Sequence, residues 1–332
     1  MAKLRLIRVD YDQAPELEKF YDHTIFQTIQ WLQFVSLTQN AEPVIAIIKD
    51  GNRTVGRFTG LMMKKYPCRI LGSPFPGWTT SYMGFNLEAS VSRVDALHAL
   101  EDFAFRDLKC VHFEVMDRRL SVKEVQIAKY KYGIMTGFEI DLKKSEEKLF
   151  MDMTPACRRC IRKAEKSGVQ IEIVKDLSFV DDYYAQLQDV FAKQKLVPTY
   201  GKERVQTLVE HLLPIEHLLL VRARSSEGTV IATGIFPAIN DTMYFWGGAS
   251  WRSDQILRPN EAIQWYAMCH WKQRGIIKYD MMGNGEYKRK YGGYEIAVPW
   301  VRKSKYRIFE QLRNGAKSIF AFKQRFLGLN RH

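Results

Sequence analysis

The order of hydrophobic and polar positions along the chain repeats once. Residues 44–62 and residues 218–236 each contain two apolar, strand-like runs on either side of a short turn, Asp-Gly-Asn in the first copy and Ser-Ser-Glu-Gly in the second. This pattern predicts a β-hairpin in each half. Residues 94–117 and 260–283 then place apolar residues at helical spacing, before an apolar run that is closed by an acidic residue. We therefore expect each half to contain a helix packed on a mixed sheet.

The segment between the two copies predicts the domain boundary. The sequence KKSEEKLFMD, at residues 143–152, starts a new helical pattern after the strand-like run GFEIDL, and no Pro-rich linker separates the halves. We predict an α+β protein with two tandem domains, residues 1–145 and 146–332, each with a mixed, mostly antiparallel sheet flanked by helices. This order of elements resembles the sheet of acyltransferases of the GNAT superfamily.

A strongly basic helix is predicted at the start of the second half, in the sequence TPACRRCIRKAEKSG from Thr154. Cys157, Cys160, Ile161 and Ala164 fall on one face at helical spacing. The other face contains a group of cations, namely Arg158, Arg159, Arg162, Lys163 and Lys166. Arginines near a helix N-terminus favour phosphate binding. The alternative is a solvated charged face without a ligand.

The two cysteines of this helix form a Cys-x-x-Cys pair, which is also the spacing of some metal and redox sites. A structural zinc site typically needs about four ligands, and no second Cys or His pair with ligand spacing is present. A thioredoxin-like pair would follow a strand, whereas a helix is predicted before Cys157. We therefore expect buried free thiols, no metal and no cofactor.

A second candidate site lies in the sequence YDMMGNGEYKRKYGG, residues 279–293. It matches neither the dinucleotide glycine fingerprint nor a P-loop. Lys288 stands between aromatic residues in a glycine-flanked loop, so it could donate to a developing oxyanion. The residues expected to bind substrate with it are Asn284, Tyr287, Tyr291, Gly292 and Gly293. The alternative is a basic turn that joins two strands. We expect the segment around Lys288 to be extended, which would place Lys290 on its opposite side.

Composition limits the classes of partner. The chain has 332 residues, a formal net charge of +13 and a pI near 9.4, with twelve Lys or Arg against two Glu from Lys288 onward. This excess favours a polyanionic partner such as tRNA, a nucleotide diphosphate or an anionic membrane surface. An odd number of five cysteines and the lack of an apolar run of about 18 residues predict a cytoplasmic protein.

Three motifs together resemble the Fem-type (FemABX-like) peptidyltransferases of the GNAT superfamily. They are FQTIQW at residues 26–31, MTPACRRCIRKAEKSGV at residues 153–169 and YDMMGNGEYKRKYGG at residues 279–293. The resemblance covers almost the whole chain, including its duplication. It implies transfer of an aminoacyl group from aminoacyl-tRNA to an amine of a cell-wall peptide precursor.

The resemblance also implies roles for single residues. Lys288 would assist the acyl ester carbonyl, beside Tyr287 where the family often has Phe. The arginines at 158, 159 and 162 would contact phosphates of the precursor. Gln27 and Trp31 belong to the first motif. No basic residue lies in FQTIQWLQFVSLTQN, where the family contributes a phosphate contact, so a phosphate-linked acceptor is one alternative among several.

The segment GSPFPGWTTSYMGF, residues 72–85, is expected to be a loop. Its Trp78, Thr80 and Tyr82 would suit the lining of an acceptor cleft in the first domain. An equally good interpretation is a packed loop that only connects strands.

We therefore expect an acyltransferase that forms an amide bond between an activated acyl donor and an amine acceptor, with aminoacyl-tRNA as the favoured donor. The first alternative is an N-acyltransferase that uses acyl-CoA or another acyl thioester, although RSDQILRPNEAI, before the predicted second-domain helix, lacks the glycines of the usual pyrophosphate loop. The second is a non-catalytic protein that binds RNA or a membrane surface. Residues 304–326 form a basic amphipathic stripe that would suit peripheral membrane contact, or packing on its own domain. The sequence does not specify the acyl group, the acceptor or the oligomeric state.

Overall fold

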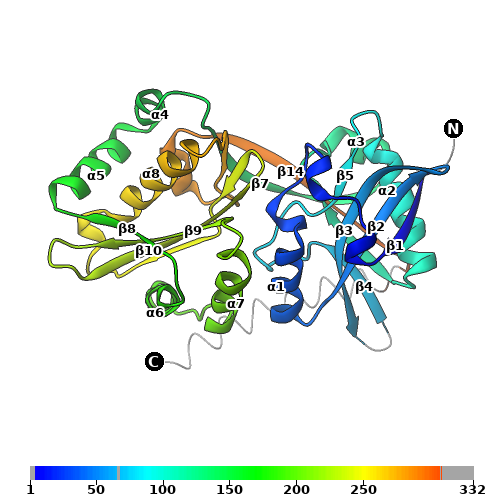
Figure 1. The fold of residues 1–332 in the computed structure, drawn as a ribbon, viewed down its shortest axis with the longest axis horizontal. Helices are drawn as coiled ribbons and strands as arrows, with labels where there is room; N and C mark the ends of the chain where they lie inside the picture. The colour runs from blue at the N-terminus through cyan, green and yellow to red at the C-terminus, as the bar shows by residue number, and fades with distance from the viewer. Residues whose placement is uncertain (1–3, 66–67, 307, 309–332) are drawn as a thin grey trace. The chain divides into compact units, whose positions relative to one another are not determined.

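The computed structural model describes residues 4–65, 68–306 and 308. Contacts within the chain divide these residues into two compact units (Figure 1). Unit 1 contains the chain as far as Met135 and again from Ala297, and unit 2 contains Thr136–Ile296. Each unit is described by itself below.

The domain boundary at residue 145 stays a prediction. The two compact units are divided differently, because unit 1 also contains a second stretch of the chain from Ala297. The last strand, β14 (Tyr294–Ser304), leaves unit 2 at Ile296 and pairs antiparallel with β6 (His112–Met116) of unit 1. The end of the second sequence copy therefore completes the sheet of the first. This exchange has no signature in the sequence, because pairing partners almost 190 residues apart do not affect local periodicity.

Unit 1 is built on a mixed sheet in the order β1-β2-β3-β4-β6-β14, with β5 added beside β3. Its further strands are β1 (Arg5–Val9), β2 (Glu42–Asp50), β3 (Arg53–Lys65), β4 (Cys68–Ser73) and β5 (Phe85–Leu87). β4 and β6 run parallel, whereas β1, β2, β3 and β4 are joined by antiparallel pairs. The predicted hairpin at residues 44–62 is the pair β2–β3, and this prediction is confirmed.

The helices of unit 1 lie on both faces of this sheet. They are α1 (Ile29–Gln39), α2 (Arg93–Asp102) and α3 (Val122–Ile127), and a π-helical turn, Phe103–Asp107, follows α2. Even-numbered side chains of β2 such as Val44 and Ala46 form a core with Leu97 of α2. Because successive strand residues point to opposite faces, Arg57 and Thr59 of β3 lie on the other face, where the Arg57 guanidinium donates to the carbonyls of Pro15 and Gln27.

Unit 2 has a sheet in the order β7-β13-β11-β10-β9-β8, with β12 also paired to β10. The strands are β7 (Lys131–Asp141), β8 (Gln170–Val174), β9 (Leu218–Arg224), β10 (Val230–Ile239), β11 (Thr242–Tyr244), β12 (Gly247–Ser250) and β13 (Lys278–Asp280). β11 and β13 are parallel and the remaining pairs are antiparallel. The second predicted hairpin is the pair β9–β10, so this prediction is confirmed too.

Helices cover both faces of the unit 2 sheet (Figure 1). They are α4 (Glu146–Asp152), α5 (Pro155–Lys166), α6 (Ser178–Ala192), α7 (Lys202–Leu212) and α8 (Pro259–Lys272), with 3-10 turns at Gln255–Leu257 and Glu286–Tyr291 (η6). α4, α5 and α8 pack on one face and share a core with β9 and β10, while α6 contacts β10 and β12 from the other face. The predicted α+β class with mixed sheets flanked by helices is confirmed.

No helix in the described part of the chain is both long enough and apolar enough to cross a membrane. The amphipathic stripe expected at residues 304–326 lies almost entirely outside the described residues. Its contact with a membrane therefore stays a prediction.

Candidate functional site

Two parallel strands of unit 2 separate at the point where the candidate site begins. β11 and β13 are paired as far as Tyr244 and Asp280, and the Phe245 N–H donates to the Asp280 carbonyl at 3.0 Å. Beyond this point β12 continues along β10, whereas the Met281 N–H donates to Phe138 of β7 at 2.9 Å. Beyond Asp280 the two strands therefore have different partners, and the Lys288 side chain lies beside this point, with Nζ 5.8 Å from the Phe245 ring.

The segment after Asp280, residues 281–293, is here called the Lys288 loop. The Asp280 carboxylate accepts the Met282 N–H at 2.7 Å and so fixes the first turn of the loop. Met282 and Gly283 have φ angles of 51° and 68°, and in this left-handed region a glycine relieves the strain of a side chain. The extended segment expected around Lys288 is wrong, because residues Glu286–Tyr291 form the 3-10 helix η6.

Lys288 turns its amine inward. Its side chain is only 8% exposed, and Nζ donates to the Met282 carbonyl. The rings of Phe245 and Tyr287 lie 5.8 and 5.7 Å from Nζ. Burial lowers the pKa of Lys288 to about 8, and the nearby Asp280 opposes this shift. Among the described residues no carboxylate lies within ion-pair distance of Nζ, so the site holds a buried cation that lacks a neutralising partner.

The basic helix α5 is fastened to this loop. Thr154 caps the helix, since its Oγ1 accepts the Cys157 N–H at 3.3 Å, and its own N–H donates to the Lys290 carbonyl at 2.9 Å. Gly292 has φ +82°, and a Cβ there would lie 2.8 Å from the Asp152 carbonyl. Gly293 is equally close to Glu139. The two glycines thus allow the end of α4 and β7 to approach the loop, and their role in substrate binding stays a prediction.

The cations of α5 have different surroundings. Arg158 donates to the carbonyls of Met151 and Met153 at 2.7 and 2.8 Å, so it closes the end of α4. Arg162 lies over the Phe150 ring at 5.3 Å. Arg159, Arg162 and Lys163 are exposed. These three side chains are therefore the more accessible candidates for an anionic ligand, and the assignment of all four to substrate remains a prediction.

The cysteines of α5 lie as their spacing predicted, with one difference. Cys157 is 1% exposed, and its Sγ lies 3.9 Å from the Met153 sulfur, whereas Cys160 is partly exposed at the edge of the same face. Burial raises the pKa of the Cys157 thiol to about 12. No group of three metal-ligating side chains is found in the described residues.

The remaining residues of the loop are held by contacts that the sequence did not reveal. Lys290 forms an ion pair of 2.6 Å with Glu261, which lies in the first turn of α8 and is 7% exposed. Tyr291 is buried, whereas Tyr287 is 55% exposed and its ring lies beside Lys288 Nζ. No local signal predicts the pair Lys290–Glu261, because its members are 29 residues apart.

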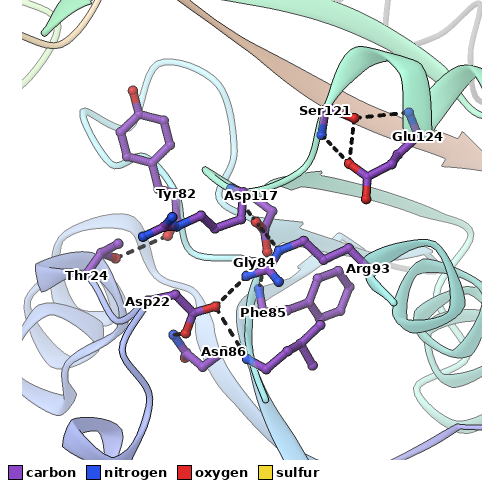
Figure 2. Close-up of polar contacts among 12 residues, drawn as sticks. Asp22, Thr24, Tyr82, Gly84, Phe85, Asn86, Arg93, Asp117, Ser121 and Glu124 are labelled. Carbon is purple, nitrogen blue, oxygen red and sulfur yellow. Dashed lines mark hydrogen bonds and ion pairs between the residues drawn. The ribbon is translucent and has the colours of Figure 1, made fainter. Parts of the chain in front are cut away.

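The candidate residues of unit 1 lie together, but in its interior. Trp31 Nε1 donates to Thr80 at 3.1 Å, and Gln27 donates to the Met83 carbonyl. Tyr82 is buried, with its carbonyl accepting from Thr24 at 3.2 Å (Figure 2). These bonds fasten residues 80–83 to the segment 24–31, which leads into α1, and agree with a packed loop.

Trp78, in the same loop, is half-buried, with its ring 4.8 Å from that of Phe75. Substrate contact by Trp78 and by the buried residues Gln27, Trp31, Thr80 and Tyr82 stays a prediction.

A buried ion network in unit 1 was missed by the sequence analysis. Arg93 of α2 donates to Asp117 at 3.0 Å and pairs with Asp22, and all three side chains are almost fully buried (Figure 2). Asp117 also accepts the Phe85 N–H at 2.9 Å. Burial alone would lower the pKa of Arg93, but the two carboxylates raise it on balance. The only signal was the acidic residue at the end of the apolar run in each sequence copy.

Comparisons with known proteins agree with this geometry. Residues 155–289, less than half of the chain, match the family model of an acetyltransferase (GNAT) domain. A search of curated protein sequences finds no significant match.

Solved structures show the fold over most of the chain. The crystal structure of FemX superposes with a TM-score of 0.72 at 13% identity, covering 89% of this chain and 96% of that one. L-PGS from Bacillus licheniformis gives a TM-score of 0.54 at 11% identity, covering 87% and 90%. The C-terminal domain of a putative lysylphosphatidylglycerol synthetase from Agrobacterium fabrum gives 0.52 at 10% identity, covering 80% and 84%.

The predicted resemblance is therefore confirmed at the level of fold and class. The matched domain includes α5 and Lys288, and the superposition with FemX shows a shared fold over most of the chain. The chain has the fold of FemX, and its residues 155–289 match an acetyltransferase (GNAT) domain, which supports an acyltransferase.

Proposed function

We propose that the protein transfers an acyl group from an activated ester to an amine, and that aminoacyl-tRNA is the donor. The observation that supports this most directly is the Lys288 amine, which is buried at the divergence of β11 and β13 without a carboxylate partner. With a pKa of about 8, most of this amine is protonated at pH 7. A buried cation of this kind is suited to stabilise a negative oxygen that appears during a reaction.

In the proposed reaction the nitrogen of a neutral amine attacks the ester carbonyl carbon. The carbonyl oxygen becomes an oxyanion, which accepts hydrogen bonds from the Lys288 ammonium. When the tetrahedral species collapses, the carbon–oxygen bond to the donor breaks, and the departing oxygen takes up the proton that the attacking nitrogen loses, so that the donor leaves with a hydroxyl group. Lys288 keeps its proton throughout, so its contribution is electrostatic.

The start of α8 argues against acyl-CoA bound at that helix in the usual way. A CoA pyrophosphate would need free N–H groups and no negative charge at the helix N-terminus. Here Pro259 removes one N–H, Arg258 adopts a left-handed conformation, and the buried Glu261 adds a carboxylate in the first turn. The neighbour named as a lysylphosphatidylglycerol synthetase supports an aminoacyl donor.

The exposed cations Arg159, Arg162 and Lys163 are proposed to bind phosphates of the donor or of the acceptor. Each neutralised phosphate of a nucleic acid contributes a slope of about −0.7 to −0.9 to the plot of log K against log salt concentration. Reversing the charge of Arg159 and Arg162 should therefore weaken binding and flatten this plot. Reversal of an exposed cation elsewhere in unit 2, such as Lys175→Glu, serves as the control.

One alternative within the same class is an N-acyltransferase that uses an acyl thioester, which the match to an acetyltransferase domain favours. The two are separated by offering the protein a panel of charged tRNAs and acyl-CoA thioesters together with a mixture of amines, and detecting the product by mass spectrometry. Amide formation from charged tRNA supports the proposal. Turnover with acyl-CoA and none with charged tRNA would favour the alternative.

A non-catalytic role in binding RNA or a membrane surface is the remaining alternative. It predicts no product with any donor and only a small loss of affinity when Lys288 is removed. A loss of turnover in the Lys288 variant, with binding retained, would exclude it.

A further inference from the structure

A pocket of about 320 Å³ in unit 1 is lined largely by cations. Its lining residues are His112, Lys129, Tyr130, Lys131, Arg302, Lys303, Ser304 and Lys305. Five of these eight residues are Lys or Arg, and none is acidic. All of them belong to unit 1, so the pocket is distinct from the Lys288 loop.

The fold assembles this pocket from two distant segments of the chain. β6 and β14 pair antiparallel, with His112 opposite Ser304, and the Lys305 N–H continues the pairing by donating to Val111 at 2.9 Å. The stretch Lys129–Lys131 follows α3 and begins β7. The basic run at residues 302–305 therefore meets a second basic run that lies about 170 residues earlier in the sequence.

Three of the five cations in the pocket have no carboxylate partner among the described residues. Lys303 pairs with Glu101 at 2.6 Å, and His112 Nε2 lies 3.2 Å from Glu114. Arg302, by contrast, has no carboxylate within ion-pair distance in the described chain, and the same holds for the lysines at 129 and 305. Arg302 Nε is moreover a buried donor without an acceptor among the described residues. Leaving such a donor unsatisfied costs about 1–3 kcal/mol.

The groups that face the pocket are mostly hydrogen-bond donors. Guanidinium and ammonium groups only donate, and the Ser304 hydroxyl lies 2.7 Å from His112 Nδ1. A phosphate offers several acceptor oxygens and matches the planar fork of an arginine. The volume lies at the lower end of the roughly 300–1,000 Å³ that small-molecule sites occupy, so a group larger than a single phosphate fits.

We propose that this pocket binds the phosphate or diphosphate group of a small soluble ligand. A concave site favours such a ligand over a nucleic acid, whose backbone follows an extended basic stripe. The proposal does not depend on the reaction assigned to Lys288, and binding at the pocket should survive replacement of that lysine.

Calorimetric titration with inorganic pyrophosphate tests the proposal. The double variant Arg302→Gln/Lys305→Gln should bind pyrophosphate at least about tenfold more weakly than the wild type, since each charge-assisted hydrogen bond contributes on the order of 1.5–3 kcal/mol. Lys123→Gln, an exposed lysine of α3 outside the pocket, should bind like the wild type. Equal affinity of all three proteins would overturn the proposal.

A second measurement needs no variant at the pocket. In the wild type, pyrophosphate should slow the acetylation of Lys129 and Lys305 by an amine-reactive ester, as read by mass spectrometry, and leave Lys123 unaffected. Protection at all three lysines, or at none, would contradict a defined site. The variant Lys288→Met should show the same protection as the wild type, and its loss would show that the pocket is not independent of that site.

Competition identifies the source of the phosphate. A nucleoside diphosphate that displaces pyrophosphate supports a soluble ligand. A different result would overturn the proposal in favour of a macromolecular or membrane partner. In that case the wild type would not bind pyrophosphate but would bind phosphatidylglycerol vesicles or RNA, and the double variant would lose this binding.

Discussion

The two units each bury a cation close to the aspartate that ends a parallel strand, but they treat its charge differently. In unit 1 Arg93 lies between Asp117 and Asp22 and is neutralised (Figure 2). In unit 2 Lys288 lies near Asp280, yet its amine donates to a backbone carbonyl. Among the described residues, no carboxylate lies within ion-pair distance of this amine. The carboxylates raise the pKa of Arg93, whereas burial lowers the pKa of Lys288.

The groups that follow the parallel strands also differ between the two units. In unit 1 the region after β4 is occupied by protein groups, because Ser73 bonds the Thr59 carbonyl at 2.5 Å and accepts the Gly84 N–H at 2.8 Å. In unit 2 the corresponding region contains Phe245 and the lysine amine. A compensated cation stabilises a fold, while an uncompensated one is a common feature of reactive sites. This comparison supports the proposal that the chemistry belongs to the second copy.

The largest expected effect concerns the network in unit 1. Replacing Arg93 by Met leaves two buried carboxylates without a counter-charge, which typically costs about 3–5 kcal/mol. We expect the free energy of unfolding, measured by urea denaturation, to fall by about that amount. Arg53→Met, which removes an exposed pair with Glu88, should change it by less than about 1 kcal/mol. A loss at Arg93 as small as that at Arg53 would show that the network is not structural.

The next prediction concerns the uncompensated cation. Lys288→Met should reduce kcat by roughly 10²- to 10³-fold, the usual loss for one oxyanion donor, and should change KM much less. Steady-state kinetics with the active donor measures both constants. The control is Lys175→Met, an exposed lysine between β8 and α6, because Lys290 is unsuitable as a control owing to its ion pair with Glu261.

The pH profile separates the role of charge from that of size. The wild-type kcat should fall at alkaline pH with a midpoint near the Lys288 pKa of about 8, because the ammonium is then lost. The residual activity of the Met variant should lack this alkaline limb. An unchanged alkaline limb in the variant would assign it to a group other than Lys288.

A smaller effect of opposite sign is expected on stability. The pKa of Lys288 is lowered from 10.5 to about 8 in the folded protein, so the unfolded chain binds this proton more tightly. Burial of the charged form therefore destabilises the fold below pH 8, and this penalty disappears between pH 8 and pH 10.5. We expect Lys288→Met to be more stable than the wild type at pH 7 and to unfold at a higher temperature. The free energy of unfolding should rise by about 1–3 kcal/mol, because one pKa unit corresponds to about 1.4 kcal/mol. The gain should shrink when the pH is raised to 9.5, and a variant less stable than the wild type at pH 7 would contradict this explanation.

The elements that could be predicted from the sequence are those with a local signal. The hairpins β2–β3 and β9–β10 and the helices α2 and α8 follow from periodicity, turn residues and duplication. The capped helix α5 follows from Thr154 and Pro155, which suit an N-cap and a first turn. Lys288 could be selected because glycines and aromatic residues surround it within a few positions.

What the sequence could not provide depends on distant partners. The residues that neutralise Arg93 lie 71 and 24 positions away, and the partner of Lys290 lies 29 positions away. The same is true of β14, whose return to unit 1 creates the basic pocket. Whether a cation is compensated is therefore decided by tertiary structure, and the contrast between the units was not visible in composition or motif.

The smallest expected effect tests whether burial alone makes a group of unit 2 reactive. Cys157 is as buried as Lys288, but burial raises its pKa to about 12, so the thiol stays neutral and unreactive at pH 7 while the lysine stays mostly charged. The double variant Cys157→Ala/Cys160→Ala should therefore retain activity within a few-fold and lose only about 1 kcal/mol of stability through the small cavity left by one sulfur. Metal analysis should find no stoichiometric zinc in the wild type. Two outcomes would contradict this prediction: one zinc per wild-type chain that is absent from the double variant, or a loss of turnover close to that of Lys288→Met. Either would mean that α5 contributes chemistry of its own and that unit 2 contains more than one reactive group.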